Sequence, residues 1–229
     1  MAIDLISGLE AGGAPLMWER VLRDTLPVMQ RLVPPGSRVL EVGYGDGLLT
    51  CYLCGELGWT VTGLDILPGA KTTATENTCR FGLENNAVFH CCNPEETWQH
   101  SGEYDAVFIK TVLYNARNLE QYAGSLDWVL SVLKSGGVLI NFESGRTNAL
   151  TQAYRRVRGR SYRNLCLYTR DVEALYDVRF EILYRQYYGG LSQFFAPIPW
   201  LYRFAAGAEE TKKRHAGNCF IVGMIGRKP

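Results

Sequence analysis

Two acidic residues, Glu41 and Asp46, accompany a glycine-rich stretch in the first third of the chain. The stretch reads EVGYGDGLL over residues 41–49 and follows the apolar residues 38–40. Glycine at alternate positions permits a tight turn and close approach of the backbone to a ligand, because no β-carbon stands in the way. Such a turn between a strand and a helix gathers backbone N–H groups at the helix N-terminus, where nucleotides bind.

The two acids separate this turn from a dinucleotide-binding turn. The spacing G-x-G-x-x-G would place its third glycine or an alanine at position 48, where this chain has Leu48. Carboxylates from Glu41 and Asp46 would repel a pyrophosphate, whereas they would attract a ligand with a sulfonium or ammonium group. The turn therefore predicts a ligand that carries positive charge.

Strands and helices alternate around this turn. Apolar runs predict five strands, over 38–43, 59–65, 87–92, 104–110 and 136–143, with helices over 16–32, 48–58 and 70–83 and another before the fifth strand. Strands that are apolar on both faces favour a parallel sheet covered by helices on both sides. After about residue 144 the alternation ends, and we expect only a short helix over 169–177, N-capped by Thr169, and two late antiparallel edge strands over 178–188 and 218–228.

The pattern resembles the first motif of the class I S-adenosylmethionine-dependent methyltransferases, E/D-x-G-x-G-x-G. The motif is Glu41-Val42-Gly43-Tyr44-Gly45-Asp46-Gly47 here, and Asp65 closes the second strand 18 residues beyond Gly47. The family places an acid there on the cofactor ribose, and a carboxylate suits a cis-diol because two acceptor oxygens meet two hydroxyl donors. Asn93 stands where the family often has an aspartate near the adenine amino group. The resemblance covers roughly residues 36–143, 166–188 and 218–229.

The resemblance implies a Rossmann-like, mostly parallel seven-stranded α/β sheet with helices on both faces and an insertion before the last strands. We expect a single domain over 1–229. It comprises an N-terminal helical cap (1–35), a cofactor-binding core (36–144), a segment with the insertion, late helix and strand that forms a substrate lid (145–217), and the last strand (218–229). The implied cofactor is S-adenosyl-L-methionine, and the residues expected to bind it are Glu41, Gly43, Tyr44, Gly45, Gly47, Asp65, Ile66, Asn93 and Lys110.

The leading functional hypothesis is methyl transfer to an oxygen or nitrogen of a small-molecule acceptor by in-line displacement. The residues expected to contact the acceptor are Trp18, Tyr114, Phe195 and Trp200. An oxygen or nitrogen acceptor can need a base, and His215, Tyr114 and Lys110 are candidates. No spacing singles out one of them, so the catalytic residue is unknown.

Two alternatives stay open. Residues 151–229 carry 14 Lys/Arg and 6 Asp/Glu, a net charge of +8, whereas residues 1–150 carry 10 and 17, a net charge of −7. The segment 155–163 follows Tyr154 and contains five arginines, Arg155, Arg156, Arg158, Arg160 and Arg163. It could bind an RNA strand by charge and stacking, or its arginines could pair with acidic residues of the first half of the chain. A non-catalytic regulatory protein that binds the cofactor is the second alternative.

Composition sets the remaining expectations. The chain has 229 residues, of which 47% are hydrophobic, and no apolar run long enough for a membrane helix. Its seven cysteines form no disulfide pattern, and Cys51 and Cys54 fall within an apolar helix, which favours core packing over a redox or metal site. Free thiols and the absence of a recognisable leader favour a cytoplasmic location. We expect no metal, and a homodimer is left open.

Overall fold

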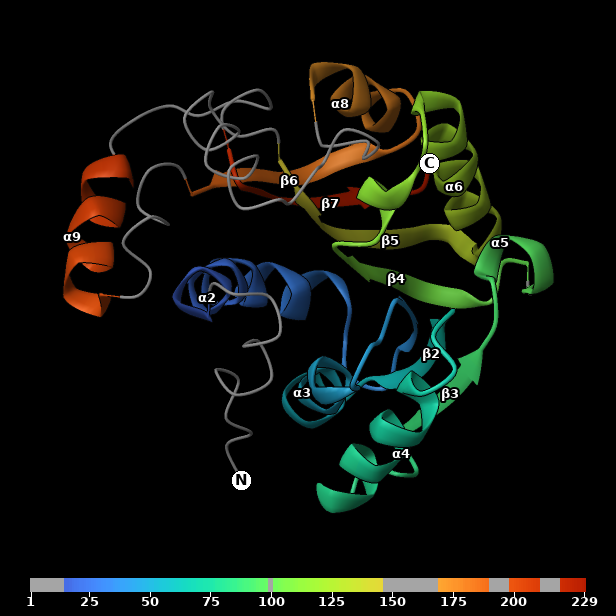
Figure 1. The fold of residues 1–229 in the computed structure, drawn as a ribbon. Helices are drawn as coiled ribbons and strands as arrows, with labels where there is room; N and C mark the ends of the chain where they lie inside the picture. The colour runs from blue at the N-terminus through green and yellow to red at the C-terminus, as the bar shows by residue number, and fades with distance from the viewer. Residues whose placement is uncertain (1–14, 99–100, 146–168, 190–197, 211–218) are drawn as a thin grey trace.

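Seven strands form one sheet in the order β3-β2-β1-β4-β5-β7-β6. The computed structural model describes residues 15–98, 101–145, 169–189, 198–210 and 219–229 (Figure 1). β7 is antiparallel to both of its neighbours, β5 and β6, and the other strand pairs are parallel. The strands are β1 (Arg38–Val42), β2 (Thr60–Asp65), β3 (Ala87–Cys91), β4 (Tyr104–Lys110), β5 (Leu133–Ser144), β6 (Glu181–Tyr188) and β7 (Ile221–Arg227).

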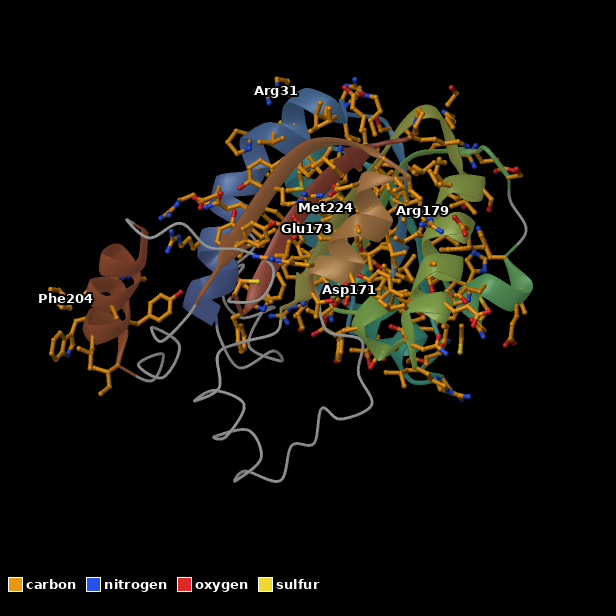
Figure 2. The ribbon with its side chains drawn as sticks, turned by 90° about the horizontal axis from the view of Figure 1, so that it is seen from above. Arg31, Asp171, Glu173, Arg179, Phe204 and Met224 are labelled. Atoms are coloured by element: carbon orange, nitrogen blue, oxygen red, sulfur yellow. The ribbon has the colours of Figure 1, made fainter. Side chains whose placement is uncertain are left out.

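Helices cover both faces of the sheet, as the apolar strands require (Figure 1). On one face α2 (Pro15–Leu32), α3 (Leu48–Leu57) and α4 (Ala70–Arg80) enclose an apolar cluster that includes Trp59, Phe108 and Phe142. On the other face α6 (Leu119–Val132) and α8 (Arg170–Asp177) enclose a second cluster. Figure 2 shows Met224 of β7 beneath α8, which carries Asp171 and Glu173. The sequence prediction of a Rossmann-like sheet with helices on both faces is thus confirmed.

Capping residues set where the helices begin and end. α3 lies between Gly47 and Gly58, both in the left-handed conformation that glycine adopts without strain. Asn118 caps α6, its side chain accepting a hydrogen bond from the backbone N–H of Gln121. Thr169 caps α8 by accepting from the backbone N–H of Val172, as predicted.

Three short elements were not predicted from the sequence. They are α5 (Pro94–Thr97), the 3₁₀ helix η2 (Leu113–Asn115) and α9 (Pro199–Glu210). α9 begins at a proline, which is tolerated at the first helical position because its missing N–H needs no partner there. It lies away from the sheet and carries Phe204 on its outer side (Figures 1 and 2). Within the described residues, no helix combines the length and hydrophobicity needed to cross a membrane.

A buried hydrogen-bonded network joins the sheet to α6 and α8. The amide nitrogen of Asn141 on β5 donates to the Tyr176 hydroxyl at 2.5 Å, and the hydroxyls of Tyr176 and Tyr122 lie 2.7 Å apart. All three side chains are buried, with exposed fractions of 0–1%. Buried polar groups are costly unless they are paired, so Tyr176 fixes the position of α8 against both neighbours.

We therefore expect Tyr176→Phe to destabilise the protein by about 1–3 kcal/mol, since it leaves two buried polar groups without their shared partner. Urea unfolding followed by circular dichroism measures the effect. Tyr52→Phe is the matched control, because Tyr52 is also buried but no hydrogen bond of its hydroxyl is seen among the described residues. Equal stability of Tyr176→Phe and Tyr52→Phe would show that the network adds nothing.

Candidate functional site

The glycine turn between β1 and α3 is as tight as its sequence predicts. Gly43, Gly45 and Gly47 all have positive φ, at 78°, 56° and 75°. A β-carbon on Gly43 would lie 2.3 Å from a methyl group of Val112, and one on Gly47 would lie 2.6 Å from the β-carbon of Ala74. The turn therefore tolerates no side chain at these two positions, and its backbone packs directly against the turn after β4 and against α4.

Asp65 ties the end of β2 to this turn. Its Oδ2 accepts a hydrogen bond from the backbone N–H of Gly45 at 2.9 Å, and its Oδ1 accepts one from the N–H of Leu67, also at 2.9 Å. The residue is only 8% exposed. Each carboxylate oxygen has a second lone pair, so both can still accept a hydrogen bond from a ligand in the cleft.

Glu41 is buried at the end of β1, with 2% of its surface exposed. Its Oε2 accepts a hydrogen bond from the Thr50 hydroxyl of α3 at 2.5 Å. Burial raises the pKa of the Glu41 carboxyl to about 7, while the Thr50 hydrogen bond and the positive charge of Lys110 oppose this rise. Asp46 lies nearby on the turn, where its Oδ1 accepts from the backbone N–H of Leu48 at 3.2 Å.

Lys110 ends β4 on the same face of the sheet as Glu41. Its ammonium nitrogen lies 4.8 Å from the centre of the Trp18 ring of α2, a cation–π contact. Burial lowers the pKa of Lys110, and the negative charges of Glu41 and Asp46 counteract that effect. Trp18 is itself 3% exposed and packs edge-on against Phe142.

A cleft of about 710 Å³ opens between these groups, at the carboxyl ends of β1, β2 and β4. Strand order reverses direction here, since β2 and β4 flank β1 on opposite sides, and ligands of open α/β sheets bind at such points. The lining residues come from the glycine turn, the start of α4 and the turns after β2 and β4. They are Glu41, Val42, Gly43, Tyr44, Gly45, Asp46, Leu49, Leu64, Asp65, Ile66, Leu67, Gly69, Ala70, Thr73, Pro94, Lys110, Thr111, Val112 and Asn115.

Comparison with known proteins identifies the domain that holds this cleft. Residues 39–137 match the family described as "Methyltransferase domain", a range that runs from the second residue of β1 to the start of β5 and includes the glycine turn. The matched residues, 39–137, form a methyltransferase domain. A comparison with curated protein sequences gives no match.

Solved structures share the fold of this methyltransferase domain at low sequence identity. The N-methyltransferase NodS from Bradyrhizobium japonicum, in complex with S-adenosylhomocysteine, is 17% identical with a TM-score of 0.64, over 96% of this chain and 91% of that one. The geranyl diphosphate C-methyltransferase from Streptomyces coelicolor is 12% identical with a TM-score of 0.65, over 90% and 77%. The [4+2]-cyclase SpnF is 19% identical with a TM-score of 0.62, over 93% and 83%.

The residues of the methyltransferase cleft fit S-adenosylmethionine. The cleft volume lies in the range of small-ligand sites, about 300–1,000 Å³. Three carboxylates, from Glu41, Asp46 and Asp65, line it and suit a ligand with cationic groups. The Tyr44 hydroxyl is buried with no hydrogen-bond partner among the described residues, and burial raises its pKa to about 12. A polar group of a ligand would satisfy that hydroxyl.

Most of the cofactor residues predicted from the sequence line this cleft. They are Glu41, Gly43, Tyr44, Gly45, Asp65, Ile66 and Lys110. Gly47 lies behind the turn against Ala74, and Asn93 is exposed and does not line the cleft, so its predicted contact with the adenine stays a prediction.

The acceptor residues predicted from the sequence are not brought together. Trp18 is buried under Lys110, and Tyr114 lies in η2 near the buried Glu143 and does not line the cleft. Trp200 is 71% exposed on α9 and does not line the cleft, and Phe195 lies outside the described residues. The substrate lid over residues 145–217 therefore stays a prediction, as do its acceptor contacts.

Glu143 is a residue that sequence reasoning missed. It is fully buried at the end of β5, where its Oε1 accepts a hydrogen bond from the backbone N–H of Ser144 at 3.1 Å and its Oε2 has no hydrogen-bond partner among the described residues. Burial raises its pKa to about 8, and the nearby backbone N–H groups of Leu113 and Tyr114 oppose this rise. Glu143 therefore lies beside the turn after β4, in which Thr111 has a φ of 53° that is unusual for a residue with a side chain. The signal that could have identified Glu143 in the sequence is an acidic residue within the apolar strand predicted over residues 136–143.

The raised pKa of Glu41 predicts a pH-dependent stability. The carboxyl is protonated in both states below its unfolded value of 4.5, and stability is lost as pH rises from there to about 7, because the unfolded state releases its proton while the buried group still holds it. Glu41→Gln does not titrate, so its stability relative to the wild type should rise by about 1–3 kcal/mol from pH 5 to pH 8. Urea unfolding at each pH measures the difference. The exposed Glu96→Gln is the control, and a pH-independent difference for Glu41→Gln would contradict the assignment.

Proposed function

We propose that this protein transfers the methyl group of S-adenosylmethionine to an oxygen or nitrogen of a small-molecule acceptor by in-line displacement. The observation that carries the proposal is the convergence of three carboxylates on a glycine turn in one cleft of ligand size. That charge pattern opposes a pyrophosphate cofactor and favours an adenosyl ligand with cationic groups.

Each part of the cleft has a role in this proposal. Asp65 accepts hydrogen bonds from the ribose hydroxyls, and Ile66, which is 66% exposed, covers the adenine with apolar surface. Glu41 and Asp46 stabilise the cationic methionine end. The glycines let the backbone approach the ligand, and the Tyr44 hydroxyl, which has no hydrogen-bond partner among the described residues, pairs with a polar group of the ligand.

The bound cofactor supplies a methyl group that its positively charged sulfur has already activated. The protein therefore needs mainly to hold the acceptor in line with that methyl group and to exclude water. In this proposal the acceptor approaches the cleft wall after β4, residues 110–115, and the buried Glu143 lies beside that wall. No base is assigned among the described residues.

A small-molecule acceptor is supported by the kinds of protein that share the fold. Similar structures include a geranyl diphosphate C-methyltransferase and the N-methyltransferase NodS. The alternative of an RNA acceptor depends on residues 155–163, which lie outside the described residues. The similarity to a [4+2]-cyclase shows that this fold also occurs in a protein named for another reaction, so the reaction itself needs a direct test.

Replacing Asp65 tests the cofactor part of the proposal. Asp65→Ala removes the predicted acceptors of the ribose hydroxyls, so the affinity for S-adenosylhomocysteine should fall by about tenfold or more. Isothermal titration calorimetry measures this, with thermal unfolding to confirm that the variant folds. Asp171→Ala, the same substitution at an exposed acid of α8 that does not line the cleft, should change the affinity little. Equal losses in both variants would place the ribose elsewhere.

Methyl transfer can be measured directly with S-adenosylmethionine that carries a tritiated methyl group. The protein is incubated with pooled metabolites, lipids and tRNA, and the label in each fraction is counted. We expect label in the metabolite or lipid fraction. Label confined to tRNA would establish the RNA alternative, and no label despite tight binding of S-adenosylhomocysteine would favour the non-catalytic one.

A further inference from the structure

Lys110 is the one positively charged residue among the described residues that line the cleft. The register pairs Val42 of β1 with Ile109 of β4, so Lys110 lies beside Gly43 and diagonally across from Glu41. Side chains at alternate positions of a strand share a face, which puts Lys110 on the side of Phe108 and the α2 helix. A positive charge here is unexpected in a cleft that is proposed to hold a cationic ligand.

The ammonium group of Lys110 is positioned in the cleft by its neighbours and does not extend into bulk water. The ammonium lies against the Trp18 ring, and the side chain is only partly exposed. Glu41 and Asp46 are the charged groups that act on it, and both stabilise the protonated form. In the absence of a ligand, Lys110 is therefore the internal cation that balances the carboxylates of the glycine turn.

Lys110 lies at the end of the cleft away from Asp65, since β1 separates the strands that carry the two residues. The cleft runs from Asp65, Ile66 and Leu67 after β2 to Lys110 and the turn after β4. If Asp65 takes the ribose, the sulfur lies toward β4. The cofactor and its demethylated product have the same ribose, amino and carboxylate groups and differ in charge only at this sulfur, which is a cation in one and neutral in the other.

We propose that Lys110 disfavours the positively charged sulfur of S-adenosylmethionine relative to the neutral sulfur of S-adenosylhomocysteine. The inference rests on the proposed function and adds a role for one residue in it. During transfer, a lone pair of the acceptor forms the new bond to the methyl carbon, and the electron pair of the breaking carbon–sulfur bond stays on the sulfur. Positive charge leaves the sulfur as this happens, so Lys110 destabilises the reactant more than the transition state, which favours the reaction.

The test is the ratio of the two dissociation constants within one protein, measured by isothermal titration calorimetry. Lys110→Met removes the charge with little change in side-chain volume. We expect the Kd for S-adenosylmethionine, divided by the Kd for S-adenosylhomocysteine, to fall by about tenfold, which is the effect of one unit charge at several ångströms in a partly buried site. Any fraction of misfolded variant affects both constants equally, so it cancels in the ratio.

Three controls make the result specific. Lys110→Arg keeps the charge and should keep the wild-type ratio. Lys71→Met is the matched substitution at an exposed lysine of α4 that does not line the cleft, and it should also leave the ratio unchanged. The shift produced by Lys110→Met should become smaller as salt is added, since the interaction is Coulombic.

The outcomes separate this inference from the proposed function. If the wild type binds neither S-adenosylmethionine nor S-adenosylhomocysteine, the proposed function itself is wrong. If it binds both and Lys110→Met leaves the ratio unchanged, only the role of Lys110 is overturned. Loss of both affinities at a constant ratio, with binding of methylthioadenosine retained, would also overturn it, because Lys110 would then hold the carboxylate that both ligands share.

Discussion

Negative charge buried at the carboxyl edge of the sheet is the constraint on which the site depends. A carboxylate away from water must be paired or hydrogen-bonded, and Glu41 and Asp65 both end strands inside the protein. Thr50 of α3 donates to Glu41, and the N–H of Gly45 donates to Asp65. The start of α3 and the shape of the glycine turn therefore satisfy the acids as well as forming a space for a ligand. A single set of contacts positions β1, β2 and α3 relative to one another.

The sequence was sufficient to predict the strands and the glycine turn, because these features depend on residues that are neighbours in the chain. Apolar runs located the strands, and the glycines at 43, 45 and 47 located the turn. A buried strand needs apolar residues and a tight turn needs glycine, so both features can be recognised from neighbouring residues. The charge argument at Glu41 and Asp46 also needed only residues within one turn. The family resemblance added Asp65, and the structure places that carboxylate within 2.9 Å of the turn.

Features that depend on packing between distant segments were not accessible in this way. The sequence predicts that Trp18 contributes to an acceptor pocket, but it does not show that α2 buries this ring between Lys110 and Phe142. Asn141 and Glu143 were read as part of an ordinary apolar strand. The partner of the Asn141 amide nitrogen comes from α8, and Glu143 lies near η2, so nothing close to them in the sequence shows what surrounds their polar groups.

The position of β7 has a consequence for how the chain folds during synthesis. β7 lies between β5 and β6, and it pairs with β5 along residues 138–144. The ribosome releases β1 to β6 before residues 221–227, so β5 has an open edge and the sheet is incomplete until that last strand emerges. Unpaired strand edges invite association with other chains. The β5 edge thus stays unpaired until residues 221–227 have been made, although the residues that line the cleft all lie within 41–115.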